Sequence, residues 1–98
     1  MNFKELLNTA YSVEYYNSNN DWGFGGAEGK IYNLPGAHKV YVMTAYFRHA
    51  KSSKFLRLID NNGEYIFEDL NDTSRNRQKI VNYFINLQPN TGHRPKGK

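Results

Sequence analysis

A chain of 98 residues without a cysteine fits a single domain and excludes a disulfide framework, a thiolate nucleophile and a cysteine-based metal site. No segment approaches the ~20 apolar residues that span a bilayer, and the first ten residues lack the apolar run of a signal peptide. We therefore expect a cytoplasmic protein (in the host cytoplasm if the source is viral) that has no membrane partner.

The first two predicted elements are a short helix and a strand. Asn2 can cap a helix whose apolar positions follow the i, i+3, i+4, i+7 spacing of one face, namely Phe3, Leu6, Leu7 and Ala10. Ser12–Tyr16 then alternates, so that Val13 and Tyr15 share one side of a strand.

The middle of the chain predicts two further strands. Trp22–Gly29 is rich in glycine and is expected to form a loop or a glycine-bent strand. Lys30–Leu34 predicts a short strand that Pro35-Gly36 ends. His38–His49 is the strongest strand, and because neither of its faces is polar we expect it to be central and covered on both sides.

A hairpin is predicted next. Lys51–Lys54 is interpreted as a polar connection to a strand over Phe55–Asp60. Residues 60–63, Asp-Asn-Asn-Gly, have the composition of a tight turn, because Asn and Gly tolerate positive φ. Glu64–Glu68 is the expected partner strand.

The final element is an amphipathic helix. Asn71 or Asp72 is expected to cap it, and Pro89 to end it. Its apolar stripe is wide enough to pack on a sheet and consists of Ile80, Val81, Phe84, Ile85 and Leu87.

Together these elements predict an α+β fold, with a mostly antiparallel sheet of four or five strands and a short N-terminal and a C-terminal helix packed on it. Residues 1–89 are expected to form the domain, and residues 90–98 a flexible basic tail.

Most of the net charge of +4 comes from that tail. Without His93–Lys98 the chain loses three of its thirteen basic residues, which leaves ten against nine acidic residues. The folded part is therefore nearly neutral, which favours a protein partner over nonspecific binding of nucleic acid.

The glycine-rich segment contains the first candidate site. A phosphate-binding loop needs a following helix and a Gly-Lys-Ser/Thr ending, and residues 30–35 provide neither. Trp22 and Phe24 instead predict a recognition loop that presents two aromatic anchors to a partner.

Two clusters of basic residues are further candidate binding sites. The first, at one end of the sheet, comprises Arg48, His49, Lys51, Lys54 and Arg57, and the second, in the first turns of the final helix, comprises Arg75, Arg77 and Lys79. Either cluster suits phosphate groups or an acidic protein face. The competing interpretation is that the lysines are solvated and the arginines pair with nearby carboxylates. Arg57 lies between two leucines, where a charge needs a partner.

Tyrosine and histidine are the remaining residue types that could take part in binding or catalysis. Eight tyrosines are too many for all hydroxyls to be buried and satisfied, so some must lie at the surface, where they can stack on bases or anchor a protein. The three histidines, His38, His49 and His93, share no helical face and no ligand spacing. No metal site, cofactor or catalytic residue is predicted.

The favoured hypothesis is a non-catalytic inhibitor or adaptor of the phage or mobile-element type. Its target would be a protein or protein–nucleic-acid complex, bound in the manner of an anti-CRISPR protein. One alternative is direct binding of DNA or RNA through the basic clusters and surface tyrosines. The other is a small metal-independent ribonuclease that uses His49, for which no general base is identified. The oligomeric state stays open.

Overall fold

A computed structural model describes residues 1–18, 26–47 and 50–87 of the chain. The predicted end of the domain at residue 89 and the tail 90–98 lie outside this range. Two helices and five strands follow one another as α1 (Phe3–Asn8), β1 (Ser12–Ser18), β2 (Ala27–Leu34), β3 (His38–Phe47), β4 (Ala50–Ile59), β5 (Tyr65–Asn71) and α2 (Ser74–Leu87).

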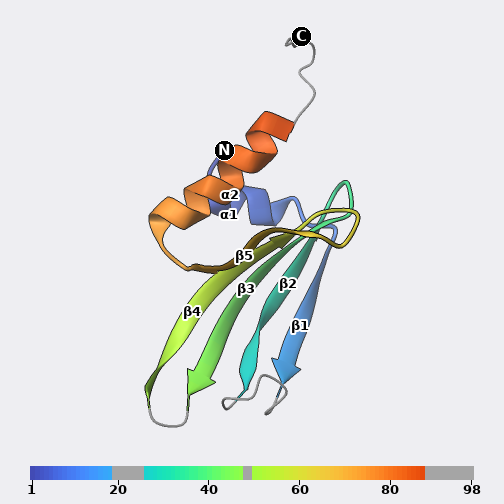
Figure 1. The fold of residues 1–98 in the computed structure, drawn as a ribbon. Helices are drawn as coiled ribbons and strands as arrows, with labels where there is room; N and C mark the ends of the chain where they lie inside the picture. The colour runs from blue at the N-terminus through green and yellow to red at the C-terminus, as the bar shows by residue number, and fades with distance from the viewer. Residues whose placement is uncertain (19–25, 48–49, 88–98) are drawn as a thin grey trace.

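The five strands form one antiparallel sheet in chain order, with β3 in the centre, which confirms the predicted α+β fold. Figure 1 shows both helices stacked on one face of the sheet near one end of the strands, while the other ends of β1 to β4 extend beyond them. We call this side of the sheet the helix-bearing face. No helix in the described ranges is long and apolar enough to cross a bilayer.

The predicted cap of α1 is confirmed. The Glu5 N–H donates to Asn2 Oδ1 at 2.8 Å, and the Asn2 N–H donates to Glu5 Oε1 at 2.9 Å. This capping box satisfies N–H groups that the first turn leaves free. The helix then ends at Asn8, where the Thr9 hydroxyl donates to the Leu6 carbonyl at 2.7 Å.

Several strand boundaries differ from the predicted ones, and β5, for example, runs from Tyr65 to Asn71 instead of from Glu64 to Glu68. β1 continues to Ser18, β2 begins at Ala27 within the glycine-rich segment, and Lys51–Lys54 belongs to β4 instead of forming a connection. In β4, Ser53 pairs with Ala45 and Lys54 with Thr44. In these segments backbone pairing extends the strands beyond the apolar alternation, and Ser18 and Ala27 at the strand ends are buried.

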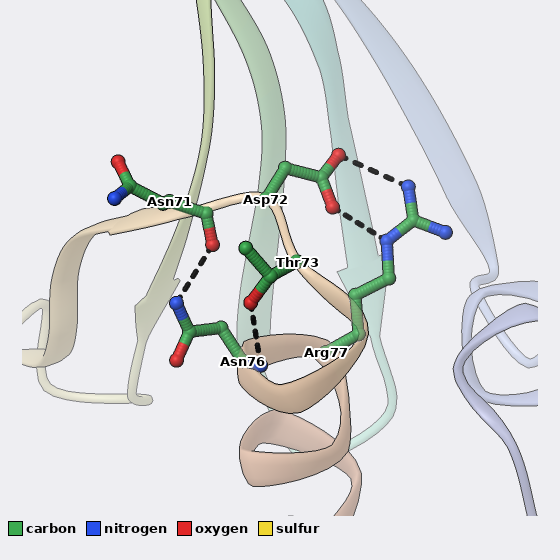
Figure 2. A network of polar contacts seen from close by, with 5 residues as sticks. All are labelled: Asn71, Asp72, Thr73, Asn76 and Arg77. Atoms are coloured by element: carbon green, nitrogen blue, oxygen red, sulfur yellow. Dashed lines mark hydrogen bonds and ion pairs between the residues drawn. The ribbon is translucent and has the colours of Figure 1, made fainter.

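Thr73 caps α2, so the prediction of Asn71 or Asp72 is wrong. The Thr73 side-chain oxygen accepts the Asn76 N–H at 3.1 Å, and the Thr73 carbonyl accepts the first helical hydrogen bond from the Arg77 N–H at 2.9 Å. Figure 2 shows that Asn71 and Asp72 serve other partners: the Asn71 carbonyl accepts from Asn76 Nδ2, and Asp72 pairs with Arg77.

The main core lies between the helices and the sheet. Of the predicted α2 stripe, Ile80, Val81 and Phe84 are buried, whereas Ile85 and Leu87 are exposed. The core consists of these three residues together with Phe3, Leu6, Leu34, Val40, Leu56 and Leu58.

The opposite face of the sheet has a smaller core that contains no helical residue. Met43 and Phe55 are buried there with Ala27 and Ala45. The expected cover of β3 is therefore present on this face too, where Met43 and Ala45 are buried, although no helix of the described residues contributes to it. On this face the cover comes from side chains of neighbouring strands, among them Tyr16 and Tyr41.

Gly29 in β2 allows this second core to close. A Cβ atom at this position would lie 2.2 Å from the Val42 carbonyl oxygen and 2.8 Å from Met43 Cα. Both are backbone atoms, so the contact cannot be relieved by a change of side-chain rotamer. Glycine is required here because β2 and β3 approach each other closely.

We expect Gly29→Ala to lower the free energy of unfolding by about 3 kcal/mol, because the strands must separate to admit the methyl group. Gly63→Ala is the matched control: nothing lies within 4 Å of its Cβ position, and the φ of +81° should cost about 1 kcal/mol. Urea unfolding of both variants gives the comparison. Equal losses would contradict the steric account of Gly29.

The turn between β4 and β5 confirms the predicted hairpin. The Asp60 carboxylate accepts the N–H groups of Asn62 at 2.8 Å and Glu64 at 2.9 Å, and Gly63 has positive φ. The hydrogen bond from Glu64 is the main cause that lowers the pKa of the Asp60 carboxyl below its ordinary value of 3.8.

This lowered pKa makes a part of the stability depend on pH. The folded state favours the carboxylate, so the stabilisation is present above pH 3.8 and is lost as the pH falls through the lower folded pKa. We expect Asp60→Asn, which keeps an acceptor oxygen but cannot titrate, to lose less stability than the unmodified chain between neutral pH and pH 3. Urea midpoints at several pH values measure this difference. Identical pH profiles would show that Asp60 does not contribute.

Candidate functional site

The helices leave part of their own face of the sheet uncovered. The register places Asn17, Glu28, Thr44 and Lys54 in one row across β1 to β4. Tyr15 and Lys30 begin the next row, whose remaining members, Val42, Leu56 and Leu70, belong to the main core or pack against it. The helix layer therefore stops at this second row.

One carboxylate organises the uncovered area. Glu28 accepts a hydrogen bond from the Tyr46 hydroxyl at 2.6 Å on one oxygen and from the Tyr15 hydroxyl at 3.2 Å on the other. Asn17 Nδ2 lies at 3.5 Å from the second oxygen. The hydrogen bond to Glu28 raises the pKa of the Tyr46 hydroxyl above its ordinary value of 10, because ionisation of the phenol would remove the proton that it donates.

The rings that this carboxylate holds are accessible to a partner. Tyr15 is 68% exposed and Tyr46 is 42% exposed, although their hydroxyls are engaged. A hollow of about 240 Å³ lies beside them, with Glu28, Lys30 and Thr44 in its lining. We call this surface the aromatic shelf and define it as Val13, Tyr15, Glu28, Lys30, Thr44, Tyr46 and Lys54.

Two lysines border the shelf. Lys30 and Lys54 are exposed, and neither has an ion-pair partner within the described ranges. The shelf thus combines exposed aromatic rings, one central negative charge and two peripheral positive charges. Such a surface can bind by ring contact and by charge-assisted hydrogen bonds.

A second cavity lies at the opposite end of the sheet, under α1 and the end of α2. It measures about 330 Å³ and is lined almost entirely by apolar residues, with Leu34 and Phe84 among its buried members. His38 also lines it and is buried, and its Nδ1 has no hydrogen-bond partner among the described residues. The His38 ring packs edge-on against Phe84, with 5.1 Å between centroids. No carboxylate hydrogen-bonds to this histidine in the described part, so it lacks the partner of an acid–base pair.

Several of the predicted site residues lie outside the described residues. These are the aromatic anchors Trp22 and Phe24, the cation Arg48, and the histidines His49 and His93. Their roles stay predictions.

Arg57 lies apart from the other residues of the first basic cluster. Arg57 pairs with Tyr41 across the sheet and Lys54 with Thr44, so the two cations point to opposite faces. The expected convergence of Arg57 with Lys54 is therefore wrong, because the two are separated by an odd number of strand positions.

The expectation that the Arg57 charge needs a partner is confirmed. Its Nε and Nη2 donate to Asp69 Oδ1 at 3.2 and 2.6 Å. The guanidinium lies 5.2 Å from the ring centroid of Tyr65 and 5.6 Å from those of Tyr41 and Phe55. This enclosure by rings and a carboxylate explains the position of Arg57 without a ligand.

In the second basic cluster, Arg77 differs from its neighbours. It forms a two-pronged ion pair with Asp72, at 2.6 and 3.0 Å, which is drawn in Figure 2. Its guanidinium also lies 4.9 Å from the centroid of the Phe3 ring and so joins α2 to α1. Arg75 and Lys79 are exposed and have no ion pair in the described ranges.

The fold brings the start of α2 close to the first basic cluster. The Asp72 N–H donates to the Lys54 carbonyl at 3.0 Å, which holds the segment before α2 against β4. Lys54, exposed on β4, thus lies near the start of α2, where Arg75 is also exposed.

The shelf itself was not identified from the sequence. Surface tyrosines are expected, and Tyr11, Tyr15, Tyr46 and Tyr65 are exposed. Glu28, however, is a single glutamate among glycines, and its tyrosine partners are 13 and 18 residues away. The available signal was the alternation of β1, which places Tyr15 beside β2 once the two strands are paired.

The described residues contain no group of three or more His, Asp or Glu side chains that could hold a metal ion. Comparison of the chain with protein-family models, with curated proteins and with solved structures finds no match. The functional argument therefore depends on the geometry of the site.

Arg75 and Arg77 of α2 allow a comparison between an arginine that forms an ion pair, Arg77, and one that forms none in the described ranges, Arg75. We expect Arg77→Ala to lower the free energy of unfolding by about 2 kcal/mol, because the Asp72 side chain, only 7% exposed, is left as an unpaired charge. Arg75→Ala should change it by less than about 0.5 kcal/mol. Chemical unfolding of both variants measures the contrast, and a small effect in both would remove the structural role given to Arg77.

Proposed function

We propose that the chain is a small non-catalytic binding protein that docks a protein partner on the aromatic shelf. The observation that carries this proposal is the arrangement of Tyr15 and Tyr46, whose exposed rings are both anchored by the Glu28 carboxylate. An inhibitor or adaptor of the phage or mobile-element type, acting in the anti-CRISPR manner, is the kind of protein that this reading favours.

Anchored rings lower the cost of association. A tyrosine has few rotatable bonds and presents a large contact area, and a side chain that is already held loses less entropy when a partner binds. The hydrogen bonds from Tyr15 and Tyr46 to Glu28 fix the hydroxyl ends while the ring faces stay accessible. Aromatic anchors of this type are enriched among the residues that dominate binding energy at protein interfaces.

The charges of the shelf favour a protein over a nucleic acid. The central group is the Glu28 carboxylate, which would repel the phosphates of a strand stacked on Tyr15 and Tyr46. Lys30 and Lys54 at the sides add positive charge, so the shelf has both signs. A mixed surface of this kind complements the polar rim of a protein interface.

The second candidate function is direct nucleic-acid binding, and one observation supports it. The contact between Asp72 and the Lys54 carbonyl brings the exposed cations of β4 and α2 to one side. Lys54 and Arg75 can contact phosphates there without involving Glu28. The acidic residues Asp69 and Asp72 in the same region reduce the net positive charge, which is why we rank this function second.

The two functions can be separated by quantitative capture from a lysate of source cells, with and without nuclease. We expect the unmodified chain to recover a specific protein. The amount recovered should fall at least about tenfold with Tyr15→Ala or Tyr46→Ala, which corresponds to about 1.4 kcal/mol of binding energy. Glu28→Gln should give a smaller loss, because the rings remain but one charge-assisted hydrogen bond is weakened.

Ile85→Ala is the matched control, since Ile85 is an exposed apolar residue on α2, away from the shelf. It should recover the same protein as the unmodified chain. Equal recovery by all variants would rule out the shelf as the docking site. Loss of the partner after nuclease treatment, together with loss in Arg75→Glu but not in Tyr15→Ala, would favour the nucleic-acid function instead.

A further inference from the structure

Strand β1 forms one edge of the sheet, and some of its backbone groups have no partner among the described residues. The Tyr46 N–H donates to the Gly26 carbonyl, which therefore points to β3. Backbone groups alternate in direction along a strand, so the even-numbered residues of β2 direct their N–H and C=O groups to β3. The odd-numbered residues of β2 direct theirs to β1. Their β1 partners are the even-numbered residues. The N–H and C=O groups of Val13, Tyr15 and Asn17 therefore point away from the sheet.

The two edges of the sheet differ in how they are protected against strand pairing. β5, at the other edge, has two register shifts against β4 and a residue with left-handed φ, Asp69. Bulges and acidic residues of this kind prevent a flat edge from pairing with another chain. β1 has an unbroken register with β2 over its seven residues and contains no lysine, proline or bulge.

The single charged residue of β1 does not block the edge. Glu14 lies on the opposite face of the sheet, where its Oε2 accepts a hydrogen bond from Asn33 Nδ2 at 3.0 Å. The residues of β1 on the helix-bearing face are Val13, Tyr15 and Asn17; all three are exposed, and the first two, with Val13 at 50%, are apolar or aromatic. An added strand would cover part of this surface and satisfy the outward backbone groups.

We propose that the β1 edge binds a second copy of this chain, through antiparallel pairing of β1 with β1 around a two-fold axis at Tyr15. A self-complementary strand is the simplest partner for an unprotected edge, because a two-fold axis satisfies both edges at once and closes the assembly. This inference is independent of the proposed function, since it concerns the backbone of β1 and not the ring faces of the shelf.

The pattern of outward groups and charges selects one register. With Tyr15 opposite Tyr15 of the second copy, Val13 lies opposite Asn17, and every outward N–H and C=O of β1 finds a partner. A shift by two residues in either direction leaves Val13 or Asn17 without a partner in β1, and the shift that places Val13 opposite Tyr15 also sets Glu14 directly opposite Glu14. Like charges in that position are destabilising, so the first register is favoured.

The symmetry has a structural consequence. The two-fold axis of such a pair runs perpendicular to the sheet, so both helix layers lie on the same side of one continuous sheet. The two aromatic shelves then meet along β1 and form the floor of a groove between the helix layers.

Proline at an outward position tests the pairing without removing a hydrogen bond of the fold. Val13→Pro loses an N–H that has no partner within the sheet, a position that edge strands tolerate. Light scattering should give twice the 11.4 kDa of one chain for the unmodified protein and one chain for Val13→Pro. Val13→Lys, which keeps the backbone, is the second variant if circular dichroism shows that Val13→Pro does not fold.

Single-cysteine variants test the register, because the chain has no cysteine of its own. Opposed Tyr15 residues would have Cα atoms about 5.5 Å apart, within the range of a disulfide. The two Val13 residues would be roughly 13 Å apart or more. Under mild oxidation Tyr15→Cys should therefore give a covalent dimer on a non-reducing gel, and Val13→Cys should not.

Three results would overturn the proposal. The first is an unmodified chain that stays monomeric across about a hundredfold dilution series. The second is a dimer that survives in folded Val13→Pro or Val13→Lys. The third is oxidation that links Val13→Cys and Tyr15→Cys equally, which would exclude the two-fold axis at Tyr15.

Discussion

The structure depends on a mismatch between the area of the sheet and the area that two short helices can cover. α2 has 14 residues and is about 21 Å long, and α1 has only six residues. The two longest strands have ten residues each and span about 33 Å. The helices can therefore close the core over one end of one face. All other surfaces of the sheet must be stabilised by the strands themselves.

On the opposite face, side chains of the strands themselves cover the sheet, without a helix of the described residues. Met43 lies against Gly29, where the missing Cβ lets β2 and β3 come close. Farther along, the apolar stem and planar head of Arg57 lie among three aromatic rings, and Asp69 neutralises the charge. An arginine that looks like a binding residue in the sequence thus acts as a cover for the sheet.

The features predicted correctly are those decided by neighbouring residues. The Asn2 cap needs only Glu5, three residues away, and the Asp60 turn is complete within the hairpin. The prediction for Lys51–Lys54 was wrong because this segment has no apolar pattern of its own and becomes a strand only by pairing with β3. The Glu28 site was not predicted for the same reason, since its hydrogen-bond donors come from two other strands, β1 and β3. Trp22 and Phe24, outside the described residues, stay predictions.

The uncovered half of the helix-bearing face and the unprotected β1 edge have one common origin. Helices that reached across β1 would bury Val13 and Tyr15 and leave no place for Lys30 and Glu28, which are tolerated there because water reaches them. A monomer would gain stability from extending α1 over this area, and a lysine or proline in β1 would protect its edge against pairing. The chain instead keeps its exposed rings in fixed positions through Glu28, at the cost of exposed apolar area. A recognition surface requires exposed side chains that are held in fixed positions, because such side chains lose less conformational entropy when a partner binds.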